Sequence, residues 1–166
     1  MTSTSADESP GEPDVEPGVV VNHIGLCVDD LARAVRFYTE VLGFVVDREL
    51  KVPDEAAAEL LAITPPVNAT AVYLTLGSFV LELLHFDRPD NPARRGRVFN
   101  EPGLTHLSVA VEDLDAVVAL VPERGGEIVT VLAGAVMVRD PDGQLIEILP
   151  MAYRRSLDQR RRPTSE

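Results

Sequence analysis

Four side chains of this sequence are candidate ligands for a divalent metal ion. They are two histidines and two glutamates: His23, Glu82, His106 and Glu147. Imidazole nitrogen and carboxylate oxygen together suit divalent Co, Mn, Ni, Zn or Fe. If the site is octahedral, four protein ligands leave two positions for water or for a bidentate oxygen substrate. Such an ion is a Lewis acid able to stabilise an enolate or an ene-diolate.

The four residues occupy equivalent places in two copies of one repeated sequence. Two pairs of segments carry the repeat, Asn22–Leu31 with Thr105–Leu114 and Gly77–Leu84 with Asp142–Leu149. The first pair, NHIGLCVDDL and THLSVAVEDL, aligns at an offset of 83 residues and places His23 over His106. The second pair, GSFVLELL and DGQLIEIL, aligns at an offset of 65 residues and places Glu82 over Glu147. The chain is therefore predicted to contain two copies of one structural unit.

Each copy is predicted to be a βαβββ module of an α+β protein. In the first copy we expect strands at 19–28, 44–50, 69–76 and 79–86, a helix at 31–42 and a short helical insertion at 54–62. In the second copy we expect strands at 104–111, 127–131, 135–139 and 144–149 and a helix at 113–123. Asp29 or Asp30 can cap the first helix, and Gly43 is suited to end it. We place module one at 19–88 and module two at 102–150, within one domain spanning 19–153.

Strand periodicity predicts which face of the sheet carries the candidate ligands. Side chains alternate across a strand, so His23 lies on the face opposite Ile24, Leu26 and Val28, which suit packing on the helix. The other three candidates follow the same rule on their own strands. The residues beside the histidines are small, namely Gly25, Ser108 and Ala110, which leaves room above the sheet. Two modules packed side by side could then bring all four side chains to one point in a mostly antiparallel, cup-shaped sheet.

Composition and charge exclude several classes of function. The chain has 166 residues and a formal net charge of −12, which argues against a nucleic-acid partner or an anionic membrane surface. Its single cysteine, Cys27, excludes an intramolecular disulfide, and we interpret it as a small buried hydrophobic residue. Without a recognisable signal peptide or an apolar run long enough for a membrane helix, the expected location is the cytoplasm.

Both ends of the chain are expected to be tails. Residues 1–18 carry five acids, no basic residue and many Pro, Ser and Gly residues, which predicts a disordered acidic tail. From 154 to 166 there are five arginines against two acids, which we interpret as a mobile basic tail.

The motifs resemble those of the vicinal oxygen chelate superfamily, which includes glyoxalases, bleomycin-resistance proteins and dioxygenases. The carrying segments are HIGLCVDDLARAVRFYTEVLGF, LELL, GLTHLSVAVEDL and DPDGQLIEIL, and the resemblance covers residues 19–150. It implies paired βαβββ modules around a metal, with His23, Glu82, His106 and Glu147 at the family's ligand positions. It further implies a small-molecule substrate and a homodimer, with the metal site formed either within one chain or between two.

The resemblance leaves more than one chemistry open. The motifs are closest to those of methylmalonyl-CoA epimerase and glyoxalase I, which implies a metal-dependent lyase or isomerase with Glu147 as both ligand and general base. An acyl-CoA thioester is one candidate substrate. The second possibility is an iron-dependent extradiol dioxygenase using His23, His106 and Glu147, although Glu82 would then occupy an open position. The third is a small-molecule binding or resistance protein without turnover.

Substrate-binding residues are predicted from position and chemistry. Arg97 belongs to an arginine cluster between the modules and could receive a phosphate or carboxylate. Tyr73, on a central strand of module one, could line the cup. The epimerase pattern also includes a second acid/base carboxylate on the third strand, and 68–77 contains none.

Overall fold

The computed structural model describes residues 18–92 and 98–161. The first half contains β1 (Ile24–Cys27), α1 (Leu31–Glu40), β2 (Val45–Lys51), α2 (Asp54–Leu61), β3 (Ala69–Leu76) and β4 (Phe79–Phe86). The second half contains β5 (His106–Val111), α3 (Leu114–Glu123), β6 (Glu127–Leu132), β7 (Ala135–Arg139), β8 (Leu145–Pro150) and α4 (Met151–Arg161). The expected elements are therefore present in the expected order, with α4 added.

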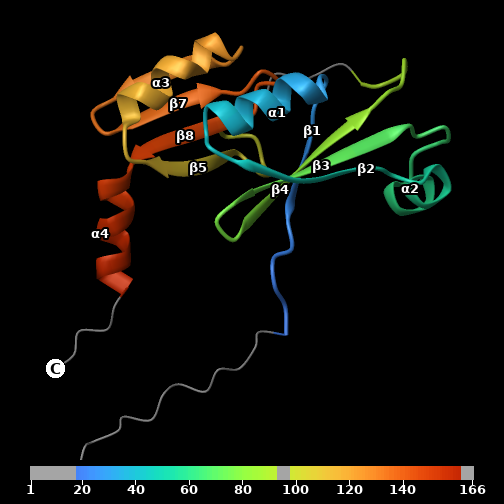
Figure 1. The fold of residues 1–166 in the computed structure, drawn as a ribbon, viewed down its shortest axis with the longest axis horizontal. Helices are drawn as coiled ribbons and strands as arrows, with labels where there is room; N and C mark the ends of the chain where they lie inside the picture. Colours follow the sequence, from blue (N-terminus) through green and yellow to red (C-terminus); the bar gives the residue numbers. More distant parts are fainter. Residues whose placement is uncertain (1–17, 93–97, 162–166) are drawn as a thin grey trace, which may run out of the picture.

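The strands form two open four-stranded sheets with the same topology. Their orders are β1-β4-β3-β2 and β5-β8-β7-β6. β1 pairs parallel with β4, and β5 pairs parallel with β8. The remaining pairs are antiparallel. The two sheets are seen at the two ends of the molecule in Figure 1. The predicted α+β architecture of two βαβββ modules is confirmed.

The two main helices begin in the same way, as a repeated unit requires. Asp30 caps α1 by accepting a hydrogen bond of 2.9 Å from the backbone N–H of Arg33. Asp113 caps α3 by accepting a bond of the same length from Ala116 N–H. A capping carboxylate satisfies backbone donors that the first helical turn leaves without a partner. The local sequence thus starts both helices at matching places in the repeat.

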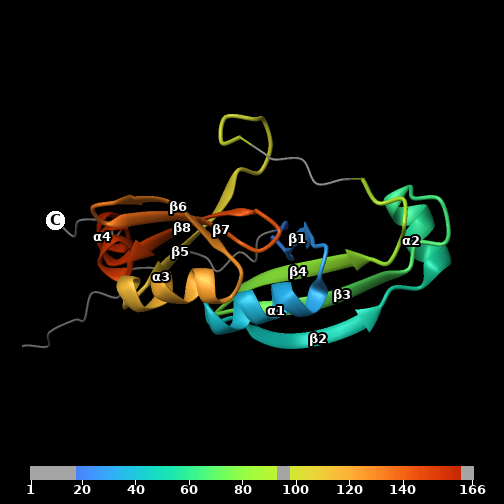
Figure 2. The same cartoon turned by 90° about the horizontal axis from the view of Figure 1, so that it is seen from above.

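The modules share one hydrophobic core. Phe37 and Tyr38 of α1 are fully buried, and they belong to the same cluster as Val138, Ile146 and Ile148 of module two. Figure 2 shows the two sheets side by side with α1 and α3 on the same side of them. Burial of one apolar cluster by both halves favours folding as a single domain.

The outer strands are much more exposed than the inner ones. Every residue of β2 and β6, the last strands of the two sheet orders, is exposed. Each carries apolar side chains, including Val45 and Val46 on β2 and Val131 and Leu132 on β6. Among the described helices, none is both long and apolar enough to cross a membrane.

The structure differs from the sequence-based expectations at the strand ends and at the C-terminus. The first strand begins at Ile24 instead of Val19, and Val19–Val21 are exposed and outside the sheet. Residues 154–161, expected to belong to a mobile basic tail, instead lie in α4, and the rest of that expected tail falls outside the described residues. Arg, Gln, Leu and Ala are good helix formers, and Arg154 pairs with Asp158 one turn later at 3.3 Å, which supports a helix. The expected acidic tail falls almost entirely on residues outside those described.

Candidate metal and substrate site

The first candidate ligand pair lies in module one. His23 immediately precedes β1, and Glu82 lies on the neighbouring strand β4, opposite Gly25 in the parallel ladder. The distance between His23 Nε2 and Glu82 Oε2 is 3.2 Å. The Glu82 side chain is 12% exposed and that of His23 is 32% exposed. The two donor atoms therefore lie together at the open face of the first sheet.

Gly25 keeps space free beside Glu82. A Cβ atom added at Gly25 would lie 3.4 Å from Glu82 Oε2 and 3.7 Å from Leu84 Cδ1. Any longer side chain would extend into the region that the carboxylate faces. The small residue expected from the sequence is thus part of the geometry of this pair.

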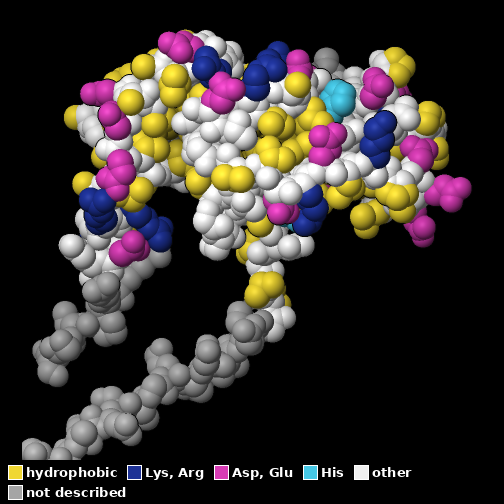
Figure 3. Space-filling model, in the orientation of Figure 1, with side chains coloured by type: hydrophobic (Ala, Val, Ile, Leu, Met, Phe, Trp, Pro, Cys, Tyr) yellow, Lys and Arg dark blue, Asp and Glu magenta, His cyan; other side chains and the backbone are white. Residues whose placement is uncertain are grey.

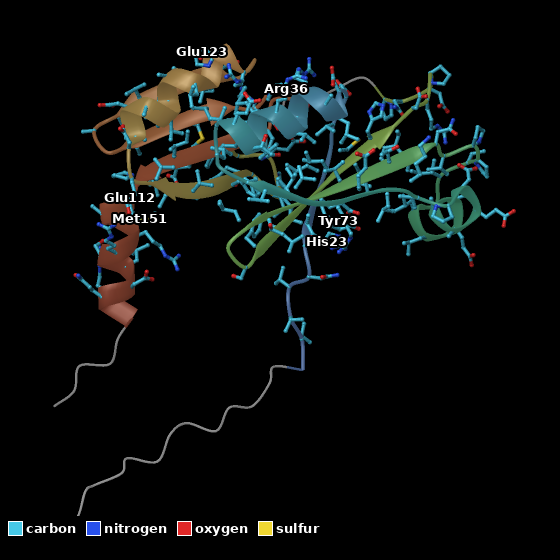
Figure 4. All side chains as sticks on the ribbon, in the orientation of Figure 1. His23, Arg36, Tyr73, Glu112, Glu123 and Met151 are labelled. Carbon is cyan, nitrogen blue, oxygen red and sulfur yellow. The ribbon has the colours of Figure 1, made fainter. Side chains whose placement is uncertain are left out.

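Tyr73 lies next to the same pair. It is the cross-strand partner of Glu82 on β3, and its ring meets that of His23 edge-on, with centroids 5.6 Å apart. A hydrogen bond to Glu82 raises the pKa of the Tyr73 hydroxyl, with burial and the negative charge of Glu82 acting in the same direction. The guanidinium carbon of Arg48 lies 4.2 Å from the centre of the Tyr73 ring. Figure 4 shows His23 and Tyr73 close together.

The second candidate pair occupies the matching place in module two. His106 is the first residue of β5, and Glu147 lies on β8 opposite Ser108. The distance between His106 Nε2 and Glu147 Oε2 is 4.0 Å. Ser108 donates a hydrogen bond of 2.7 Å to that same glutamate oxygen. Ser108 occupies the position that Gly25 has in module one, so a hydroxyl here replaces open space.

Two further residues orient His106. The Oγ1 atom of Thr105 lies 2.9 Å from its Nδ1, and the ring of Phe99 stacks on it with centroids 5.1 Å apart. A partner on Nδ1 leaves Nε2 available to a ligand, which is the usual arrangement around metal-binding histidines. Phe99, Thr105 and Arg48 were missed at the sequence level, because these contacts depend on loop and strand geometry instead of on a motif.

The donor atoms fit a divalent metal in chemistry and in spacing within each pair. Two ligands about 2.1 Å from one ion and at right angles lie roughly 3 Å apart. The His23–Glu82 separation of 3.2 Å is close to this value, and the His106–Glu147 separation is longer. In residues 18–92 and 98–161, no three His, Cys, Asp or Glu side chains are grouped to hold one ion. The four candidate ligands are therefore present in this chain as two separate pairs.

Other candidate residues lie in varied surroundings. Arg97, predicted to bind substrate, lies outside the described residues. His85 lies outside the two pairs and donates from Nδ1 to the carbonyl of Val28 at 3.1 Å. Cys27, interpreted as buried, is exposed. Exposure alternates along β1, and Cys27 lies with Gly25 on its exposed side. The small, apolar character of cysteine alone predicted burial, but the strand alternation decides its position.

A cavity of about 720 Å³ is bordered by His106 of the second pair, whereas Glu147 is not among its lining residues. One wall is the edge strand β5, which contributes residues 106–110 from both of its faces. The other walls come from the tip of the β3–β4 hairpin and from α4. The size is that of a pocket for a small organic ligand.

The chain thus has the architecture of a protein built from two βαβββ modules, with a His–Glu pair on the open face of each sheet. The chain belongs to the Glyoxalase/Bleomycin resistance protein/Dioxygenase superfamily, whose family model matches residues 20–148. The resemblance seen in the sequence motifs is thereby confirmed.

Relatives of this chain include lyases and epimerases. It is 29% identical over 140 residues to a probable chloroplastic lactoylglutathione lyase of Arabidopsis thaliana, covering 76% of this chain and 34% of that protein. It is 27% identical over 124 residues to mitochondrial methylmalonyl-CoA epimerase of Bos taurus, covering 74% and 64% respectively. The chain thus spans less than two thirds of the length of either relative.

Solved structures have the same fold. The trypanothione-dependent glyoxalase I of Leishmania major is 27% identical with a TM-score of 0.61, and the match covers 86% of this chain and 96% of that one. A glyoxalase family protein from Bacillus cereus gives a TM-score of 0.68 at 20% identity, covering 82% and 98%.

Proposed function

We propose that this protein is a metal-dependent lyase or isomerase that transfers a proton next to a carbonyl group. The carrying observation is the His–Glu contact found at the same ladder position in both modules. The names of its relatives, a lactoylglutathione lyase and an epimerase, support the reaction class.

His23, Glu82, His106 and Glu147 are the proposed ligands of one Co, Mn, Ni, Zn or Fe ion, which would polarise the substrate's carbonyl oxygen. Glu147 is the proposed general base. Ser108 donates a hydrogen bond to one carboxylate oxygen of Glu147. The Glu147 side chain is 31% exposed, so a substrate carbon can approach the carboxylate. Glu147 would take the proton from the carbon next to the carbonyl, and a proton would then be delivered to the opposite face of that carbon or to the neighbouring carbon, which makes the net reaction an isomerisation. Tyr73 would contact the substrate from module one.

A second copy of the chain is proposed to complete the site. The two pairs do not form a group of three or more ligands within the described part of one chain, so the His23–Glu82 pair of one protomer would meet the His106–Glu147 pair of another. The exposed apolar side chains of β2 and β6 offer surface that association could bury. A homodimer would then contain two equivalent sites.

Mixing two inactive variants tests this arrangement. One variant carries His23→Ala and Glu82→Ala, and the other carries His106→Ala and Glu147→Ala. If the site lies between chains, each mixed dimer recovers one complete site. Random re-association makes half of the dimers mixed, so refolding the two proteins together should restore about one bound metal per four chains, a quarter of the wild-type amount. A mixture that binds no more metal than its separate components would reject the shared site.

Solvent deuterium exchange tests the reaction. The reconstituted wild-type protein should introduce deuterium next to the carbonyl of an acyl-CoA thioester, and Glu147→Gln should abolish the exchange. Glu49→Gln removes an exposed carboxylate of β2 and is the matched control, which should retain the wild-type rate. Absence of bound divalent metal after reconstitution would reject the proposal, and oxygen uptake with a catechol would indicate the dioxygenase chemistry instead.

A further inference from the structure

Three valines lie exposed in front of β1. The exposed fractions of Val19, Val20 and Val21 are 88%, 68% and 84%, although β-branched apolar residues are usually found in buried strands. They lie outside the sheet, and only Asn22 separates them from the candidate ligand His23. Figure 3 shows hydrophobic side chains at this point, projecting below the body of the molecule at the lower centre of the view. This valine segment, residues 19–21, is an apolar surface that the described part of its own chain does not cover.

The cavity between β5, the β3–β4 hairpin and α4 has mostly apolar walls. Leu76 and Phe79 line it from the hairpin, Val109 from β5 and Leu157 from α4. Among the described lining residues, Arg154 of α4 is the only one with a permanent charge. Such walls suit an apolar occupant that has acidic groups beside it.

The strand β5 adds a free edge to this cavity. In the part of the chain that the structure describes, β5 pairs with β8 alone, and residues from both faces of β5 line the cavity. An edge strand presents backbone N–H and C=O groups that an extended segment of another chain can pair with. The cavity thus offers an extended segment both a strand edge and apolar walls.

The proposed dimer brings the valine segment to this cavity. Ligation of one ion would hold the Nε2 atom of His23 within about 4 Å of that of the partner's His106, and His106 lines the cavity. Because a residue spans at most about 3.6 Å, Val21 lies no further than roughly 7 Å along the backbone from His23. In its own chain the segment before β1 is separated from α4 (Figure 1), and none of residues 18–22 lines the cavity. The cavity of a second copy is therefore the expected docking place.

Charge supports the same occupant. The segment 1–17, which precedes the valines, contains five acids and no basic residue. Helix α4 contains four arginines and one aspartate, and Figure 3 shows basic side chains gathered on it at the lower left of the view. The Arg154 side chain is 55% exposed beside the cavity. A valine segment that enters the partner's cavity would carry its acidic neighbours toward these arginines, and opposite charges speed association.

We infer that the valine segment of one chain docks in the cavity of a second copy, extended along the partner's β5 and packed against its hairpin and α4. By symmetry, the two chains of a dimer exchange these segments. The choice of partner rests on the proposed function, because the shared metal is what brings His23 to the partner's His106. The cavity would then serve subunit assembly instead of substrate binding.

Disulfide formation between introduced thiols tests the docking. The full chain carries Cys27→Ser, which removes the native thiol, together with Val20→Cys and Leu157→Cys. Mild oxidation should give covalent dimers, and peptide mass spectrometry should place the link between positions 20 and 157. The matched control carries Leu60→Cys in place of Val20→Cys, because Leu60 of α2 is an apolar side chain with 84% exposure, and it should form no link to position 157. A link within one chain, or no link between positions 20 and 157, would overturn the inference.

The strength of dimerisation gives an independent measurement. A variant with Val19→Ser, Val20→Ser and Val21→Ser should dimerise at least about tenfold more weakly than the wild type, which is the loss expected when even one buried valine is removed. Leu60→Ser is the control and should dimerise like the wild type. Sedimentation velocity of the metal-free and metal-loaded proteins gives the dissociation constants. A monomeric wild type, or an unchanged dissociation constant in the triple variant, would contradict the docking.

The docking and the proposed function can fail separately. If the mixed metal-site variants recover metal binding but no link forms between positions 20 and 157, the shared site stands and the docking is wrong. If the link forms between chains but the mixed variants recover no metal binding, the docking stands and the shared metal site is wrong.

Discussion

The phenolic hydroxyl of Tyr38 donates a hydrogen bond of 2.9 Å to Oδ2 of Asp140. Tyr38 lies on α1 of module one, and Asp140 begins the turn between β7 and β8 of module two. Both residues are almost completely buried. The other carboxylate oxygen of Asp140 accepts from the backbone N–H groups of Asp142 and Gln144. One buried carboxylate thus organises its own turn and fastens that turn to the other module.

Tyr38→Phe should destabilise the protein by about 1–3 kcal/mol, because the buried carboxylate of Asp140 loses a donor that water does not replace. The measurement is urea unfolding at neutral pH. Tyr73→Phe is a control in a phenol that lies at the open face of a sheet, and its effect on stability should be smaller. Equal losses in the two variants would contradict a special role for the buried contact.

The Tyr38→Phe loss should depend on pH. Burial raises the pKa of Asp140, whereas its hydrogen bonds, including that from Tyr38, lower it. Because the folded-state pKa is raised, the group's stabilisation is greatest below its unfolded pKa of about 3.9 and falls as pH rises through the folded pKa. Removing the Tyr38 donor raises the folded pKa further, so the variant should lose more stability at about pH 7 than at about pH 4. In an Asp140→Asn background, this pH dependence should disappear.

Gly126 lies in close contact with Phe37 of module one and with Arg139 and Val121 of module two. A Cβ atom at this position would be 2.7 Å from the carbonyl oxygen of Arg139, 2.7 Å from a ring carbon of Phe37 and 2.8 Å from Val121. Gly126→Ala should therefore destabilise the fold by about 1–3 kcal/mol through overpacking. Gly18→Ala is the control, because a Cβ there meets nothing within 4 Å. Thermal unfolding of both variants would show the difference, and a neutral Gly126→Ala would contradict the close packing.

Local sequence patterns were sufficient to predict most of the fold. The β3, β4 and β7 bounds agree with the structure, because alternating apolar residues and turn residues mark these strands directly. Val19–Val21 misled the prediction of β1, since β-branched residues favour a strand only where a partner strand exists. The α4 helix was not predicted, because its cluster of arginines is typical of a solvated tail, whereas the helix propensity of these residues and the apolar Met151 and Leu157 favour an ordered helix.

The candidate site could be predicted only in part. The repeat and the strand alternation place His23 with Glu82 and His106 with Glu147, since a parallel ladder between neighbouring strands fixes each pair. The relation between the pairs depends on how the modules pack, which no local pattern records. Convergence of all four on one ion stays a prediction. The stacking of Phe99 on His106 likewise comes from the connection between the modules.

Ser108→Ala should weaken metal binding about tenfold, because partners that hold a ligating carboxylate typically contribute 10–100-fold in affinity. The hydroxyl of Ser108 donates to the Glu147 oxygen that faces His106. Ser78→Ala is the control, since Ser78 lines the same cavity from the β3–β4 hairpin. Competition with a metal-binding dye gives both affinities. Equal affinities for Ser108→Ala and the wild type would show that Glu147 needs no such support.

A graded series at Gly25 tests whether open space beside Glu82 is needed for metal binding. Gly25→Ala should be tolerated, because its Cβ would lie in ordinary contact distance, 3.4 Å from Glu82 Oε2. Gly25→Val adds two methyl groups on that Cβ, and these should displace the carboxylate from His23 Nε2. The same dye competition should then show near wild-type affinity for Gly25→Ala and a loss of about tenfold or more for Gly25→Val, the size expected when a ligand is displaced. Circular dichroism would establish that both variants fold. Unchanged affinity in a folded Gly25→Val protein would mean that Glu82 binds no metal in its observed position.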